Sequence, residues 1–188
     1  MIKRQAAPRR GREVLLQILV LIGLVTGAVT PLGANAGMAK RVAVLDIELL
    51  KPDYYPSPHK PTGDEQRRLD LVADLLRSRL SQDGYDVVGR DATRAAIRDA
   101  DPGQRLHECN GCERDIARAL DADWVLVGWV QLVSNLIINL NVVALDVDSG
   151  NSVGKAFVDL RGNTDRSWRR ATKYLLDSIL MERLAAHR

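Results

Sequence analysis

The stretch DWVLVGWVQLVSNLIINLNVVALDVDSGNSVGKAFVDLR, residues 123–161, decides the fold of this chain. Residues 123–133 form an almost continuous apolar run, which predicts a buried strand. Residues 136–146 predict a second strand, because apolar and polar side chains alternate along it. The turn residues 148–151 then predict that a third strand, 152–161, pairs back as a hairpin. In the second strand, one face is expected to carry Leu136, Ile138, Leu140 and Val142, and the other Asn135, Asn139 and Asn141.

Strands and helices alternate on the N-terminal side of this stretch. Residues 42–50 predict a central parallel strand, and the four prolines within 51–63 predict a loop after it. A long helix then runs from its expected N-cap, Asp64, to about Gln82. The remaining expected elements are a short strand at 85–88, a helix at 92–100 capped by Asp91, a helix at 113–120, and a last helix capped by Asn163 or Thr164.

The order of these elements is strand-helix-strand-helix-helix-strand-strand-strand-helix, which indicates the α/β class. We expect a single domain, 37–188, with a mixed five-stranded sheet and about four helices. Parallel crossovers build its first half and an antiparallel meander its second half. The last helix carries an apolar stripe and a second stripe one turn round: Trp168, Ala171, Leu175 and Ile179, then Leu176, Leu180 and Leu184.

Residues 1–36 have the order of a secretory signal peptide. A basic segment comes first, the apolar run 14–29 follows, and Ala34-Asn35-Ala36 supplies a small-x-small cleavage site. The apolar run is shorter than the roughly 20 residues that a membrane span needs. We therefore expect cleavage after Ala36, a periplasmic mature protein and no stable membrane span, with retention of the run as an anchor as the alternative.

The charge of the chain changes when the leader is removed. The whole sequence has 27 basic and 24 acidic side chains, a formal charge of +3. The leader holds five of the basic ones and one acidic one, so that the mature part has a formal charge of about −1. The basicity of the chain therefore belongs to the export signal, and we expect no nucleic-acid partner, because that needs a retained basic patch.

Two resemblances extend this reading. The segments VAVLD at 42–46, YDVV at 85–88 and ALDADWVLVG at 119–128 are similar in pattern to the amino-terminal domain of TolB and to the curli-secretion lipoproteins, which implies the fold only. In those proteins a glycine stands at the position of Asp121, so that this helix end has to tolerate a non-glycine turn. The segments DIELL at 46–50, CNGC at 109–112, VSNLIIN at 133–139 and RGNTDRSWRR at 161–170 resemble a family of short secreted proteobacterial proteins known only as a domain of unknown function.

The two cysteines, Cys109 and Cys112, are expected to form a disulfide, because export places them in an oxidising compartment. So short a loop gains little chain entropy, and the bond would mainly pin the turn that opens the helix 113–120. Thiol redox chemistry is an alternative, because a helix N-terminus near Cys112 stabilises thiolate. The neighbouring Glu108 and Glu113 oppose it, since their charges raise the pKa of a thiol.

A metal site is a further alternative. His107, Cys109 and Cys112 offer three ligands, and His59 is a conceivable fourth for zinc. No cofactor is otherwise expected. The sequence contains three histidines and no Ser-His-Asp order, phosphate-binding glycine loop or metalloprotease motif, so an enzyme is not expected.

A small polar pocket is also possible. Asp46 and Glu48 lie two residues apart on the predicted first strand, and paired carboxylates can do acid–base work or hold a cation. If the loops after the strands converge, the pocket would combine them with Asn135, Asn139 and Arg161. The alternative is that the strand end and the asparagine face of the sheet are exposed to solvent and have no binding role.

These features favour a protein that works by binding. The adjacent Tyr54 and Tyr55 lie in the proline loop and are candidates for a contact with a partner, because tyrosine is enriched at interfaces. We expect a non-catalytic accessory module of the periplasm that contacts another envelope protein through this loop or through a sheet edge. The alternative is a periplasmic thiol-redox or metal-handling factor that uses Cys109 and Cys112, and the oligomeric state is left open.

Overall fold

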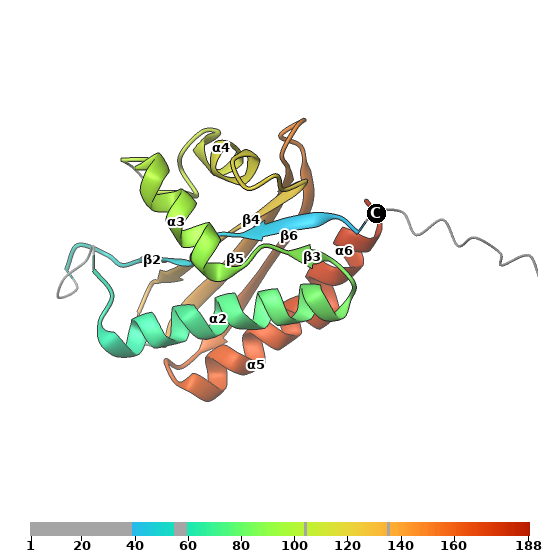
Figure 1. The fold of residues 1–188 in the computed structure, drawn as a ribbon. Helices are drawn as coiled ribbons and strands as arrows, with labels where there is room; N and C mark the ends of the chain where they lie inside the picture. Colours follow the sequence, from blue (N-terminus) through green and yellow to red (C-terminus); the bar gives the residue numbers. More distant parts are fainter. Residues whose placement is uncertain (1–38, 55–59, 104, 135) are drawn as a thin grey trace, which may run out of the picture. The chain divides into compact units, whose positions relative to one another are not determined.

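The protein is built on one mixed sheet, and its longest strands are β4 (Trp124–Leu132), β5 (Ile137–Asp146) and β6 (Ser152–Arg161). These three form the expected antiparallel meander. β1 (Arg41–Val44) pairs in parallel with β4 and with β3 (Asp86–Val87), which gives the order β3-β1-β4-β5-β6 (Figure 1). The computed structural model describes residues 39–54, 60–103, 105–134 and 136–188, and the expected signal peptide lies outside them.

The strand expected at 42–50 is two strands, which explains why the sheet has six strands and not five. β2 (Glu48–Leu50) also pairs in parallel with β4, but its register is displaced by one residue relative to β1. Before the break, the even-numbered residues Val42 and Val44 face the larger core. After the break, the odd-numbered residues Ile47 and Leu49 face it. One inserted residue therefore inverts the alternation and turns Glu48 to the opposite face of the sheet.

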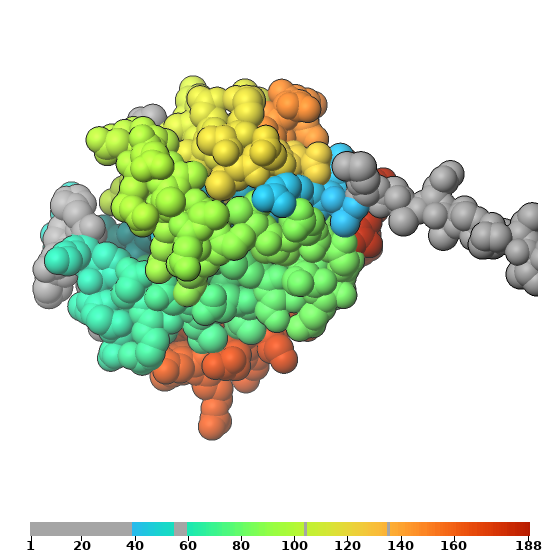
Figure 2. Space-filling model, in the orientation of Figure 1, coloured from blue at the N-terminus to red at the C-terminus, as the bar shows by residue number. Residues whose placement is uncertain are grey.

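Helices cover both faces of the sheet. α2 (Gly63–Gln82) packs against the larger core together with the C-terminal helical segment, while α3 (Arg90–Ala100) and α4 (Cys112–Arg118) cover a smaller core on the other face. In Figure 2 a blue strip of β1 stays visible between the yellow atoms of the α4 region and the green atoms below it. α3 makes its main contacts with the sheet at β1 and α4 at β4, and the smaller core reaches the end of β5 at Leu145. Beyond that point, the described helices leave this face of β5 and β6 largely open (Figure 1).

The C-terminal helix changes its phase in the middle. α5 (Asp165–Leu175) passes into a π-helical turn, η1 (Leu176–Leu180), and then into α6 (Met181–Ala185). A π turn adds one residue to the helix and so rotates the face that follows it. This rotation lets both predicted apolar stripes reach the same core, with Ile179 half-buried at its margin.

Helix and strand ends differ from the expectations in several places. Thr62, not Asp64, is the N-cap of α2, because its side chain and Glu65 form a reciprocal capping box. Gly89, not Asp91, precedes α3, whereas Thr164 caps α5 as one of the two expected residues. Asp121 takes the left-handed conformation with φ 52°, so it does replace a glycine at this turn.

Leu136 is not part of the core, contrary to the prediction. It precedes β5 and is 71% exposed, whereas Ile138, Leu140 and Val142 are buried as expected. β5 begins at Ile137, which pairs with Arg161 of β6, so Leu136 belongs to the turn. Among the described residues, no helix is long and apolar enough to cross a membrane.

Candidate functional site

The first part of the candidate site is a carboxylate that fixes a loop. The inversion between β1 and β2 directs Glu48 toward the segment that precedes α4. Its two oxygens accept hydrogen bonds from the backbone N–H groups of Leu106, at 2.8 Å, and His107, at 3.1 Å. The Nδ1 atom of His107 lies 2.5 Å from the same carboxylate. Glu48 therefore anchors this loop to the sheet through three contacts.

The imidazole of His107 is held on every side. It stacks on the indole of Trp129 with ring centroids 5.0 Å apart and an angle of 21° between the planes. Its Nε2 atom lies 3.3 Å from a carboxylate oxygen of Glu108, and its side chain is only 8% exposed. Since both ring nitrogens face carboxylates, the imidazole acts as a structural bridge between β2, β4 and the loop.

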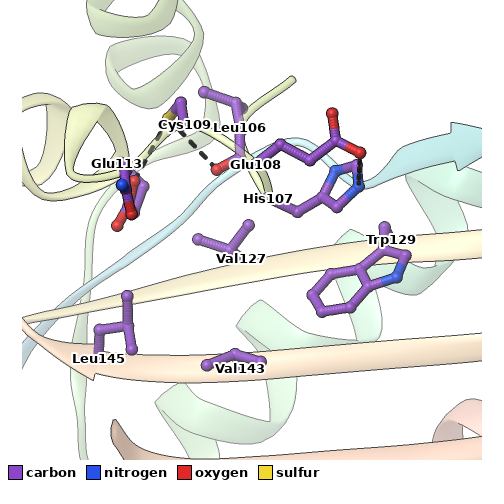
Figure 3. A pocket seen from close by; sticks show the side chains of 10 residues that line it. Leu106, His107, Glu108, Cys109, Glu113, Val127, Trp129, Val143 and Leu145 are labelled. Carbon is purple, nitrogen blue, oxygen red and sulfur yellow. Dashed lines mark hydrogen bonds and ion pairs between the residues drawn. The ribbon is translucent and has the colours of Figure 1, made fainter. Parts of the chain in front are cut away.

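A shallow groove lies beside this histidine, where the α4 loop ends over the open part of the sheet (Figure 3). Its cavity volume is about 170 Å³, below the range of roughly 300–1,000 Å³ typical of sites for drug-sized ligands. None of the described residues that line it is a serine, threonine or lysine, and its cysteine is in a disulfide. The lining consists of Leu106, His107, Glu108, Cys109, Asn110, Glu113, Val127, Trp129, Val143 and Leu145.

The disulfide Cys109–Cys112 closes the turn at one wall of this groove, with its Cα atoms 5.6 Å apart. Cys112 is the first residue of α4, and Gly111 before it has a φ of 115°, which favours glycine. Glu113 accepts a hydrogen bond from the Gly111 N–H at 3.1 Å, and the same oxygen lies 3.3 Å from Cys109 Sγ. That carboxylate would oppose a thiolate at Cys109, and so the surroundings favour a structural bond.

Metal ligation would need a reduced pair. Cys109, Cys112 and Glu113 place one ligand atom each within 4.8 Å of one another, but sulfurs joined to each other do not act as thiolate ligands. His107, the third predicted ligand, is not in this group, and its nitrogens face Glu48 and Glu108. His59 lies outside the described residues.

The other predicted polar residues take separate partners. Asp46 pairs with Arg94 of α3 at 3.1 Å, and Arg94 also binds Asp70 of α2 at 2.9 Å. Asn139 donates to Asp159 on the neighbouring strand, and the exposed Arg161 lies opposite Ile137. Within the described part of the chain, no hydrogen bond or ion pair joins Asp46, Glu48, Asn139 and Arg161 to one another. Asn135 lies outside it.

An exposed apolar patch lies at the end of the β4–β5 hairpin. The hydroxyl of Tyr54, which is 76% exposed, donates to the backbone oxygen of Val133 at 3.0 Å, and so ties the proline loop to the hairpin. The neighbouring side chains of Val133, Leu136 and Ile137 are also exposed. We call Tyr54, Val133, Leu136 and Ile137 the hairpin-end patch; Tyr55 lies outside the described residues.

The base of the proline loop is anchored by a buried ion pair that the sequence reasoning missed. Lys51 Nζ donates to Glu65 Oε2 at 3.1 Å and to the Lys60 backbone oxygen at 2.9 Å. The same carboxylate oxygen accepts from the Thr62 N–H at 2.7 Å. A lysine next to a proline gives no signal of burial, because lysine is almost always exposed.

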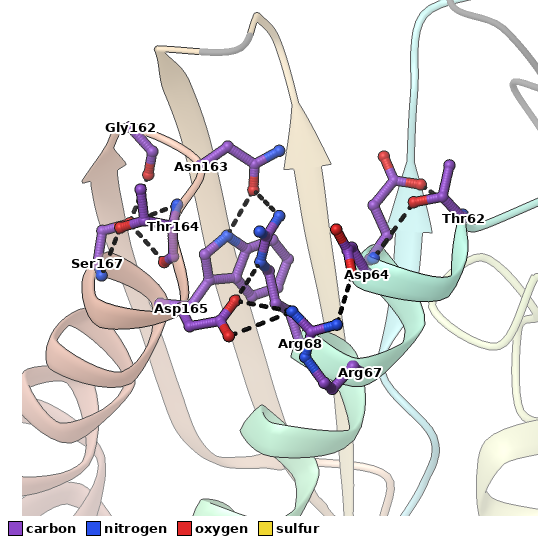
Figure 4. A network of polar contacts seen from close by, with 11 residues as sticks. Thr62, Asp64, Arg67, Arg68, Gly162, Asn163, Thr164, Asp165 and Ser167 are labelled. Atoms are coloured by element: carbon purple, nitrogen blue, oxygen red, sulfur yellow. Dashed lines mark hydrogen bonds and ion pairs between the residues drawn. The ribbon is translucent and has the colours of Figure 1, made fainter.

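The motif RGNTDRSWRR, 161–170, makes a structural junction between α2 and α5 (Figure 4). Asn163 Oδ1 accepts from the indole N–H of Trp168 and from Arg68, each at 2.9 Å. Asp165 accepts from Arg68 at 2.8 Å and also binds Arg67. Hydrogen bonds from Arg68 and then Arg67 lower the pKa of the Asp165 carboxyl. The motif therefore closes the end of the larger core.

Comparison with known proteins identifies a family without an assigned activity. Residues 40–180 match the family DUF3280, described as "Protein of unknown function (DUF2380)", which confirms the expected membership in such a family. The curated proteins contain no match.

Several solved structures are similar to this chain, and one of them is a TolB, as the sequence resemblance implied. The LpoB C-terminal domain from Salmonella enterica is 15% identical over 67% of this chain and 87% of that one, with a TM-score of 0.45. PelC from Paraburkholderia phytofirmans, a dodecamer, is 16% identical over 78% and 87%, with a TM-score of 0.43. TolB from Acinetobacter baumannii is 9% identical over 76% and 29%, with a TM-score of 0.39. At these values we infer no activity or partner from them.

Proposed function

This chain belongs to the DUF3280 family of unknown function, and we propose that it is a non-catalytic accessory protein of the periplasm. It contacts another envelope protein through the hairpin-end patch. The observation that carries the proposal is the exposure of four apolar side chains at one place, from two segments joined by the Tyr54 hydroxyl. An exposed apolar cluster costs solubility and is typical of a surface that a partner covers.

The build of the patch supports a binding role. The proline loop is held at its base by the buried Lys51–Glu65 pair and farther along by the bond from Tyr54 to Val133. A loop fixed in this way loses less conformational entropy when a partner binds it. Leu136 and Ile137 project from the hairpin beside it and can serve as apolar anchors.

A non-catalytic role agrees with the groove at His107. A general base needs a free nitrogen that faces a substrate, whereas both nitrogens of His107 face carboxylates. The described lining residues also offer no activated nucleophile. The proposed periplasmic location rests on the leader, 1–36, and agrees with a disulfide at Cys109 and Cys112.

Site-specific photocrosslinking in intact cells tests the proposal. A photoreactive residue at Leu136, in the patch, is compared with one at Arg98, a position on α3 that is also exposed. We expect a discrete crosslinked protein from the envelope fraction at Leu136 only, and its loss when Ile137→Ser is added. Equal crosslinking at both positions, or none at Leu136, would contradict the proposal.

The double variant Cys109→Ser/Cys112→Ser distinguishes the accessory module from the alternative, a thiol-redox or metal-handling factor. If the protein is an accessory module, the double variant keeps the crosslink at Leu136 while losing some stability. A thiol-redox or metal-handling factor would lose its function outright, and intact mass spectrometry of the purified protein without reductant would show a metal adduct or an easily exchanged disulfide.

A further inference from the structure

β6 is a long edge strand, and its outer side pairs with no other described strand. Among the described strands, the opposite edge of the sheet is formed by β3, of two residues, and β2, of three residues. β6 has 10 residues, contains no proline and, among the described strands, pairs only with β5. Proteins commonly blunt such edges with proline, lysine, bulges or shortness, because a long flat edge pairs with other chains. The first half of β6 has a lysine, Lys155, and a bulge between Ser152 and Gly154, but the stretch 157–161 has neither.

The free backbone hydrogen-bonding groups of this edge lie in one stretch, 157–161, which we call the window. The Gly162 N–H donates inward to the oxygen of Leu136, just before β5, so even-numbered residues of β6 from Gly154 onward direct their backbone to β5 and odd-numbered residues direct theirs outward. The outward oxygen of Lys155 is already bound by Arg183. Among the described residues, no hydrogen bond occupies the outward backbone groups of Phe157, Asp159 and Arg161.

The side chains around this window have a distinct chemistry. Phe157 is 69% exposed and Tyr174, on α5, is 56% exposed. Two adjoining hollows of about 410 and 260 Å³ follow the edge and share Val158, Asp159 and Tyr174. Arg161 and Arg170 line the second hollow, where the only acid, Asp159, is bound by Asn139. The edge is thus apolar along its middle and cationic at one end.

A second copy of this chain fits the edge poorly. A two-fold dimer pairs β6 with itself antiparallel, and four registers use this window. The register that sets Asp159 against Arg161 places Phe157 opposite a residue beyond the end of β6 at Arg161, so that Phe157 has no strand partner. Three registers remain. One sets Asp159 against Asp159, and another sets Lys155 against Arg161; like charges directly opposite each other are destabilising. The third sets Phe157 against Phe157 but needs the outward groups of Lys155, whose oxygen is taken by Arg183.

We propose that the β6 edge binds an extended segment of a partner protein, added as a further strand, with alternating apolar side chains and an acidic residue facing Arg161 and Arg170. Backbone pairing with Phe157, Asp159 and Arg161 supplies the affinity, and the arginines select the charge of the segment. Every second side chain of the segment packs on Val158 and Tyr174. This surface adds to the hairpin-end patch and does not depend on it.

Synthetic peptides test the proposal on the isotope-labelled protein as purified. The probe is a seven-residue peptide of alternating valine and threonine with one glutamate, and two further versions carry N-methyl groups on alternate amides. One version is methylated on the amides that face β6 and the other on those that face away. We expect nuclear magnetic resonance shifts and slowed amide exchange at Phe157, Asp159 and Arg161, and binding that only one methylation pattern abolishes.

Charge selection has its own control. A peptide with lysine in place of glutamate should bind about three- to ten-fold more weakly, and Arg170→Gln should remove most of that difference. Arg166→Gln, an exposed arginine of the same helix outside the hollows, should leave it unchanged. The proposal is overturned if both methylated peptides bind alike, if the shifts lie elsewhere, or if sedimentation reveals a β6-dependent dimer that the peptide dissolves. The variant Leu136→Ser, which removes part of the hairpin-end patch, should leave peptide binding intact.

Discussion

The change Lys51→Met is expected to destabilise the protein through the carboxylate that it leaves behind. The Lys51 side chain is only 2% exposed, and methionine fills a similar volume without a charge. The Glu65 side chain, which is 11% exposed, then keeps the Thr62 N–H but loses its cation. A buried charge that loses its partner is costly, because water cannot replace the lost interaction.

The magnitude follows from this geometry. Removal of one partner from a buried pair costs about 3–5 kcal/mol, and we expect the lower end, about 3 kcal/mol, because Glu65 retains one strong hydrogen bond and touches solvent. For a domain of this size, that loss corresponds to a decrease in Tm of about 6–12 °C. The matched control is Lys173→Met on the exposed face of α5, for which the expected change is within about 0.5 kcal/mol.

The effect should depend on pH with a defined sign. Burial raises the pKa of the Glu65 carboxyl, but hydrogen bonds from Thr62 and Lys51 outweigh burial and hold it below the ordinary value. A carboxyl with a lowered pKa stabilises the fold at pH values above its unfolded pKa, and that contribution is lost as the pH falls through its folded pKa. The difference between Lys51→Met and the wild type is therefore largest near pH 7 and shrinks in acid.

Urea unfolding followed by circular dichroism at pH 7 and in the acid range measures both quantities. Equal midpoints for Lys51→Met and the wild type at pH 7 would refute the structural role of the pair. A difference that stays constant down to low pH would refute the part assigned to Glu65. The combined change Lys51→Met/Glu65→Gln should recover part of the loss, since it removes the unpaired charge.

Three further outcomes are expected. The change Cys109→Ser/Cys112→Ser should lower the free energy of unfolding by about 2 kcal/mol or less, because the closed loop is short, and denaturant titration with and without reductant checks this. Asn163→Ala removes the acceptor of a buried indole N–H and should cost about 2 kcal/mol, with a shift of the indole proton resonance that a surface effect would not give. A Cβ at Gly128 would lie 2.6 Å from Ile47 Cδ1, so Gly128→Ala should cost about 1–3 kcal/mol. Adding Ile47→Val should return part of that cost in a double-mutant cycle by thermal melting, and a purely additive result would count against the steric explanation.

The meander was predictable because each of its strands stands alone as a pattern. β4 is apolar along almost its whole length, and β5 alternates from Ile138 onward, so that neither needs a distant partner to be recognised. The turn 148–151 then fixes their connection to β6. Leu136 was assigned wrongly because its spacing fits the alternation, while β5 begins one residue later, at Ile137.

The candidate site was less predictable because its contacts are distant in the sequence. Glu48 and His107 are separated by 59 positions, and nothing in either neighbourhood indicates the other. Trp129 lies on the face of β4 that carries His107, but β4 is apolar on both faces, so the sequence pattern does not show which face a given residue occupies. The disulfide could be predicted from the sequence, because its two cysteines are close together and are the only ones in the chain.

The one-residue offset between β1 and β2 has a consequence for how related chains can differ in length. Loss of a single residue from 45–46 would remove the offset and leave one regular strand, in which Ile47 and Leu49 still face the larger core and Glu48 still faces His107. A chain that kept both residues but lost the offset would instead exchange the inside and the outside of β2. We expect related chains to tolerate a gap of one residue at this point and to keep the anchored His107 loop.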